Sequence, residues 1–233
     1  MSSTRKAALV AGVFFVLTEI TGIAALALYA PVVNAPDYVI GPGADTRVLL
    51  GALSEVILVI AVIGTGVTLF PILKAQNEAV ALGYVCGRLM EAAAIAVGIV
   101  SVLSVVTLRQ DLAGAADTDT ASLVTVGRSL VALHDGTFLF GPNIALGVNT
   151  LLLAYLMYRS ARVPRPIAVL GLAGGPIIFA SATAVMFGLY EQVSVWGVIA
   201  AVPVFAWEVA LAVWLIAKGF RPAPGANALV PSS

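Results

Sequence analysis

Long apolar segments alternate with short polar breaks along the chain, and this pattern predicts helices that cross a membrane. Six apolar segments occur, at residues 7–30, 47–73, 79–108, 121–158, 164–190 and 193–218. Each is near or above the roughly 20 residues that an α-helix needs to cross the hydrocarbon core of a bilayer. We therefore predict an all-α, polytopic membrane protein. Its single domain, residues 1–220, is a bundle of six transmembrane helices, and residues 221–233 form a disordered cytoplasmic tail.

The breaks fall where turn-forming or charged residues gather: Pro31 to Gly43, Pro71 to Glu78, Asp111 to Thr120, Arg159 to Pro166, and near Glu191. The fourth segment is too long for one straight span, and two interpretations of it stay open. Gly136 and the pair Gly141–Pro142 favour a bend in one long helix. Alternatively, residues 121–136 form an outer surface helix, and the span begins near Thr137.

Composition agrees with a membrane location and excludes a nucleic-acid partner. Hydrophobic residues make up 61% of the chain and charged residues 10%, whereas soluble domains carry about a quarter charged residues. The 12 basic and 12 acidic residues balance, and no basic stripe interleaved with aromatic residues occurs. We expect membrane lipid as a partner, and the sequence leaves the oligomeric state open.

The basic residues predict the orientation of the spans. If the spans alternate in direction, most arginines and lysines fall on one side, namely Arg5, Lys6, Lys74, Arg159, Arg162, Arg165, Lys218 and Arg221. The positive-inside rule then places both termini in the cytoplasm, for a multi-pass protein of the cell inner (plasma) membrane. A cleavable signal peptide is the alternative for the first segment. We favour a span because Glu19 interrupts the apolar run, which is long for a signal peptide.

Four ionisable residues lie deep within the predicted spans: Glu19, Arg88, Glu91 and Glu208. The helical rise places each about 13–18 Å from the cytoplasmic end of its span, in one layer near the midplane. A charge there costs at least roughly 2.5–3.5 kcal/mol, so these side chains should face a polar interior. Three carboxyls against one guanidinium imply a bound proton or cation, because like charges in a low dielectric cannot all ionise.

A second polar layer is expected nearer the outside, formed by Glu55, Arg128, His134 and Asp135, so the interior should open outward. In the third span Tyr84 shares a helix face with Arg88 and Glu91. GxxxG patterns in the third and fifth spans permit close helix approach. The predicted ligand-binding or proton-titrating cavity comprises Glu19, Glu55, Tyr84, Arg88, Glu91, His134, Asp135, Asn143 and Glu208.

Each of these residues also has a structural interpretation. Arg88 with a glutamate is equally consistent with an ion pair that fixes helix register. His134 is more typical of an interfacial residue than of a catalyst, and Asn143 and Asn149 are typical of hydrogen bonds between helices. One histidine excludes bis-histidine haem, and the absence of a mid-span lysine excludes a retinal Schiff base. We expect no metal and no cofactor, since no metal-ligand, P-loop or dinucleotide motif occurs.

Several motifs resemble one bacterial membrane family across about Lys6 to Phe220. They are the segment Arg47 to Glu55, the Arg88-Leu-Met-Glu91 pair, His134 before Gly141–Pro142, Tyr158-Arg-Ser with Pro164-Arg-Pro166, and Pro203-Val-Phe-Ala-Trp-Glu208. The chain is similar here to the family catalogued as domain of unknown function 4386. The resemblance implies a six-span inner-membrane protein in which Arg47, His134 and Glu208 match the family pattern, and it supplies no activity.

Two functions remain beside a purely structural membrane subunit. The first is binding or transport of a small molecule or of protons, with titrating glutamates near the midplane. The second is an intramembrane enzyme in which Glu91 or Glu208 is a general base acting on a lipid or isoprenoid substrate. We favour binding or transport, because no nucleophile or metal set accompanies the glutamates.

Overall fold

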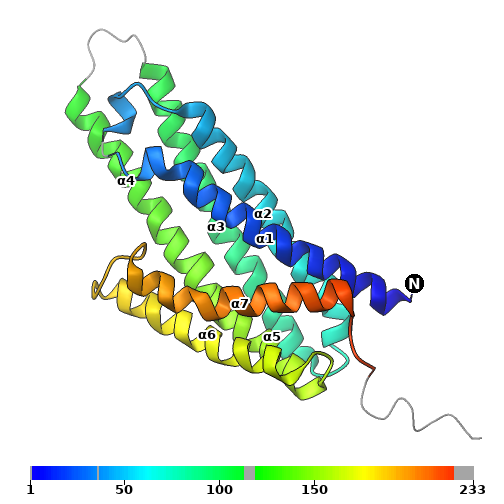
Figure 1. Cartoon of the computed structure of the whole chain (residues 1–233). Coiled ribbons are helices and arrows are strands. Elements are labelled where there is room, and N and C mark those ends of the chain that lie inside the picture. The colour runs from blue at the N-terminus through cyan, green and yellow to red at the C-terminus, as the bar shows by residue number, and fades with distance from the viewer. Residues whose placement is uncertain (1, 36, 113–118, 223–233) are drawn as a thin grey trace, which may run out of the picture.

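The structure is a computed structural model, and it describes residues 2–35, 37–112 and 119–222. All regular elements in these ranges are helical (Figure 1). They are α1 (Ser3–Val33), the 3-10 turn η1 (Tyr38–Ile40), α2 (Asp45–Leu73), α3 (Glu78–Leu112), α4 (Thr120–Leu139), the π-helix η2 (Phe140–Ala145), α5 (Leu146–Ser160), α6 (Arg165–Met186) and α7 (Val195–Ala217).

Six rods long and apolar enough to cross a membrane result, because α4, η2 and α5 are continuous over Thr120–Ser160. The prediction of an all-α fold with six spans is confirmed. The disordered tail predicted for 221–233 falls almost wholly outside the described residues.

The expected break at Pro31 is wrong, because α1 continues through Pro31 to Val33. Proline has no N–H, so the carbonyl of Ala27, four residues earlier, loses its helical partner. Arg47 of α2 replaces that partner, its Nη2 donating to the Ala27 oxygen at 2.7 Å. Pro71 likewise lies inside α2, which ends at Leu73. A side chain from the next helix thus lets α1 keep its last turn.

The fourth segment combines features of both interpretations offered by the sequence. It is one continuous helix, and its irregular turn is the π-helix η2 around Pro142. Asn143 Nδ2 donates to the Phe138 carbonyl at 3.0 Å, the group that Pro142 leaves without a partner. The first half, α4, packs on α3 and η1, whereas α6 packs along η2 and α5. Residues 121–136 are therefore a peripheral extension of the span.

The rods form a closed ring of two consecutive triplets. α1, α2 and α3 pack in sequence, as do α5, α6 and α7, and the triplets meet where α1 contacts α7 and α3 contacts α5. Figure 1 shows α1 and α7 close together near the N-terminus and diverging toward the far end of the bundle. At the near end Arg5 donates to the carbonyls of Leu215 and Ile216 at 2.7 and 2.6 Å. This cation caps the negative end of the α7 dipole.

Glycines allow the second triplet to pack closely. A Cβ built on Gly175 of α6 would lie 2.7 Å from the Gly147 carbonyl oxygen of α5, and one on Gly147 would lie 2.9 Å from the Gly175 oxygen. A Cβ on Gly171 would meet the Trp207 ring of α7 at 2.6 Å. Small residues at such contacts bring helices together in lipid, where no hydrophobic force drives them to associate.

We expect Gly175→Ala to lower the free energy of unfolding by about 1–3 kcal/mol, the usual cost of overpacking, because the clashing atom is backbone and cannot rotate away. Gly136→Ala is the matched control, since a Cβ there meets nothing within 4 Å. The melting temperature of each variant in detergent measures the effect. Equal melting temperatures for the two variants would contradict the close α5–α6 contact.

Candidate functional site

A buried guanidinium, that of Arg88 on α3, forms the centre of the site. Its Nη1 donates to Glu91 Oε2 at 3.0 Å, and its Nη2 donates to Glu208 Oε1 of α7 at 2.9 Å. All three side chains are at most 7% exposed. Because charge-assisted hydrogen bonds are strong and an unpaired buried charge is costly, the Arg88–Glu208 pair fixes α7 against α3, while the Arg88–Glu91 pair lies within α3.

The third nitrogen of the guanidinium is also occupied. Arg88 Nε donates to the hydroxyl of Tyr84 at 3.2 Å, and that hydroxyl donates to Thr65 Oγ1 of α2 at 3.4 Å. The Phe15 ring of α1 lies against the guanidinium, with its centroid 5.5 Å from Cζ. An aromatic face stabilises a desolvated cation. Arg88 is therefore contacted from α1 and α7 as well as from its own helix, and Tyr84 links it to α2.

Glu91 has a second partner, which the sequence indicated as a residue bonding between helices but not as a member of the predicted cavity. Asn149 of α5 is fully buried, and its Nδ2 donates to Glu91 Oε2 at 2.9 Å. Gly87 makes room for this amide, because a Cβ there would lie 1.8 Å from Asn149 Oδ1. The one available signal was a polar residue within an apolar helix, and the sequence alone did not separate it from Asn143.

Glu19 of α1 completes the inner cluster, which we define as Glu19, Tyr84, Arg88, Glu91, Asn149 and Glu208. The charged neighbours of its carboxyl are Glu208 and Arg88. Glu19 is half-buried, whereas Glu208 is 5% exposed. The structure thus brings together the four charged residues that helical depth placed in one layer.

The outer cluster comprises Tyr29, Glu55 and His134. Tyr29 of α1 donates to Glu55 Oε2 of α2 at 2.9 Å, and the ring of Tyr29 meets that of His134 of α4 edge to face at 5.3 Å between centroids. All three residues are buried. The sequence pointed to Glu55 and His134 but not to Tyr29, because tyrosine is common in membrane helices without a polar role.

Two predicted site residues lie elsewhere. The Asp135 side chain is 53% exposed, and it contacts His134 Nδ1 with Oδ1 at 3.3 Å while facing the surface rather than the inner cluster. Asn143 bonds within its own rod, to Phe138, instead of between helices. A change of one position on a helix turns a side chain by about 100°, which explains why Asp135 points away while His134 points inward.

An apolar layer separates the inner and outer clusters. It includes Leu58 and Val62 of α2 and Ala92 and Ile95 of α3, all buried in one core. Six residues of α3 lie between Glu91 and Gly98, the residue whose Cβ would meet the His134 ring at 3.5 Å. The helical rise makes that spacing about 10 Å. The inner cluster is therefore closed toward the outer one by packed aliphatic side chains.

A third polar group, absent from the sequence prediction, holds the far end of the bundle. Arg109 of α3 pairs with Asp45 of α2 through Nε and Nη2 and donates to the Gly41 carbonyl at 3.1 Å. Tyr38 donates to Asp45 Oδ1 at 2.8 Å. Burial, assisted by the neighbouring Asp45 carboxylate, raises the pKa of Tyr38 to about 12, so this donor stays protonated over the physiological range.

Among the described residues, no group of three His, Cys, Asp or Glu side chains is arranged to hold a metal ion. The inner cluster instead presents donors of hydrogen bonds, from Arg88, Tyr84 and Asn149, to a set of carboxyls. Such an arrangement can bind, hold and release a proton.

Replacement of Arg88 by Leu should lower the free energy of unfolding by about 3–5 kcal/mol, because Glu91 and Glu208 lose their common counter-ion. Adding Glu208→Gln should recover part of this loss, since one of the orphaned charges is then removed. Thermal unfolding in detergent measures both effects.

The matched control adds Glu191→Gln to Arg88→Leu. Glu191 is exposed between α6 and α7, so this change should recover nothing. If both double variants melt at the same temperature as Arg88→Leu alone, the loss of Arg88 does not destabilise the protein through an unpaired Glu208 carboxylate.

Comparison with known proteins identifies the family. No curated protein and no solved structure matches the chain. A family model described as Domain of unknown function (DUF4386) matches residues 10–219, a range that contains every member of the inner and outer clusters. The chain therefore belongs to the DUF4386 family, as its motifs predicted.

Proposed function

We propose that this multi-pass membrane protein is a proton-coupled carrier, in which the inner cluster takes up and releases a proton as a small solute passes through the bundle. The contact between the carboxyls of Glu19 and Glu208 carries the proposal. Two neighbouring carboxyls in an apolar interior hold one proton between them, because two adjacent carboxylates repel each other strongly in a low dielectric.

The charge balance supports the same interpretation. Arg88 supplies one positive charge and is engaged by Glu91 and Glu208. With Glu19 ionised as well, three negative charges would face one positive charge, and one bound proton reduces the net charge from minus two to minus one. A purely structural ion pair needs no third carboxyl, so Glu19 is the residue that distinguishes a titrating site from a structural pair.

The position of the cluster suggests how proton binding is coupled to movement. Glu19 and Arg88 belong to the first triplet of helices, and Asn149 and Glu208 to the second. Carriers commonly place their site between two halves that rock against each other. Separation of α1 from α7 would break the Glu19–Glu208 contact and change the affinity for the proton. A proton that binds the two arrangements unequally shifts the population between them.

Infrared difference spectroscopy tests for the shared proton. On titration of the purified protein between about pH 5 and about pH 9, a protonated-carboxyl band should disappear as the pH rises, since the base removes the proton. Glu19→Gln should abolish this band by removing one member of the pair. Glu191→Gln, which alters an exposed glutamate, should leave it unchanged. A titrating band that survives Glu19→Gln would exclude the Glu19–Glu208 pair as the proton site.

We also propose that both termini face the cytoplasm, in a plasma membrane, because the basic residues gather at the end of the bundle that holds Arg5 and Arg221. In a Cys86→Ser background, Ala121→Cys at the start of α4 should react with an impermeant thiol reagent in intact cells. Ala75→Cys, between α2 and α3, should react only after the cells are opened. Both alanines are exposed, so access alone differs between them. The reverse labelling pattern would invert the topology.

A further inference from the structure

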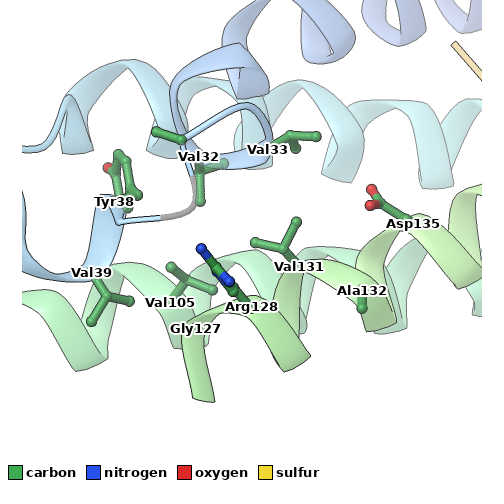
Figure 2. Close-up of a pocket in the computed structure, with 11 residues that line it drawn as sticks. Val32, Val33, Tyr38, Val39, Val105, Gly127, Arg128, Val131, Ala132 and Asp135 are labelled. Atoms are coloured by element: carbon green, nitrogen blue, oxygen red, sulfur yellow. The ribbon is translucent and has the colours of Figure 1, made fainter. Parts of the chain in front are cut away.

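A pocket separate from the inner cluster lies at the end of the bundle away from the termini. It has a volume of about 250 Å³ and lies between α4 and the corner formed by α1 and η1 (Figure 2). Its wall is mostly aliphatic and is formed chiefly by Val32, Val33, Val39, Val105 and Val131. Arg128, Ala132 and Asp135 of α4 are exposed, so the pocket opens along this side of the helix. An apolar wall beside convergent polar groups is typical of a ligand site.

Two opposite charges border this apolar wall. Arg128 and Asp135 both line the pocket, and Figure 2 shows their charged ends directed into it from the same helix. They are seven positions apart, which corresponds to about 10 Å along the helix axis. Within the described part of the chain, no carboxylate lies within ion-pairing distance of Arg128. Asp135 uses Oδ1 toward His134, which leaves its second oxygen for another donor.

The pocket also lies beyond the part of the rod that other spans cover. α6 packs along η2 and α5, whereas α4 packs on α3 and η1. The exposed side of α4 carries Ser122, Thr125 and Ser129 in addition to Arg128. Hydroxyl and guanidinium groups at the end of an otherwise apolar rod mark the level of the lipid headgroups, where cationic side chains meet phosphates. A membrane lipid can reach this pocket without leaving the bilayer.

We propose that the pocket binds a phospholipid whose headgroup carries both a phosphate and a primary ammonium, as in phosphatidylethanolamine. Arg128 binds the phosphate, because a guanidinium presents paired N–H donors to two phosphate oxygens. Asp135 accepts a hydrogen bond from the ammonium, and the glycerol region lies against the valines. The volume suits a headgroup with its first methylenes, and the acyl chains extend through the open side into the bilayer.

This assignment predicts selectivity that neither charge produces alone. A choline headgroup has no N–H to donate to Asp135, and a glycerol headgroup has no cation. The lipid site does not involve the inner cluster, so its test is independent of the test of proton-coupled transport.

Native mass spectrometry of the delipidated full-length protein, titrated with phosphatidylethanolamine, phosphatidylcholine and phosphatidylglycerol of identical chains, tests the proposal. Phosphatidylethanolamine should bind about tenfold more tightly than the other two, the value of one charge-assisted hydrogen bond. Asp135→Asn should remove this preference. Arg128→Gln should weaken binding of all three lipids, and Arg128→Lys should partly retain it. Glu191→Gln is the control and should change nothing.

Equal affinity for the three lipids, or a preference that survives both Asp135→Asn and Arg128→Gln, would refute the site. A further measurement adds free phosphoethanolamine as a competitor. At lipid concentrations that saturate the pocket we expect it not to displace phosphatidylethanolamine, because it lacks the apolar part. Competition at equal concentration would show that the pocket binds a water-soluble zwitterion instead of a lipid. Arg128 and Asp135 are exposed, so the variants should fold, and an unchanged melting temperature verifies this.

Discussion

The buried charge of Arg88 is the constraint on which this bundle depends. A guanidinium has no neutral form at accessible pH, so the protein must surround it with acceptors wherever it is buried. Tyr84, Glu91 and Glu208 accept from its three nitrogens, and the Phe15 ring covers the cation. These partners come from α1, α3 and α7, and neighbouring groups on α2 and α5 bind them in turn. Groups from α1, α2, α3, α5 and α7 are thus linked around one charge.

The requirement that a buried polar group have a hydrogen-bond partner also holds for the backbone. Lipid offers no hydrogen-bond donor, so every carbonyl that a proline exposes within a span needs a donor from the protein. Arg47 serves the Ala27 carbonyl opposite Pro31, and Asn143 serves the Phe138 carbonyl opposite Pro142. These polar residues resemble candidates for chemistry in the sequence. In the structure they complete helices, which separates them from the inner cluster, whose polar groups bind one another.

The sequence predicts the number of spans, the all-α fold and the family, because apolar length and motif order are local properties. Counting residues from the span ends also places Glu19, Arg88, Glu91 and Glu208 at one depth. The depth of a residue in the membrane does not tell which way its helix face points, however. The sequence therefore could not separate Asn149, which binds Glu91, from Asn143, which does not. Helix ends were poorly predicted at Pro31, because its missing hydrogen bond is compensated by a residue 16 positions later, Arg47.

The π-helix η2 sets the rotational phase of everything beyond it. A wide turn accommodates one more residue than an α-turn, so the faces of α4 are rotated by about 100° from where a regular continuation of α5 would put them. This phase directs His134 toward Tyr29 and leaves Asp135 at the surface. Deleting a single residue within 140–145 would restore a regular helix and turn the faces of α4 by about 100°, so that His134 no longer points toward Tyr29. The length of this turn, as much as the identity of its side chains, therefore encodes which residues line the interior.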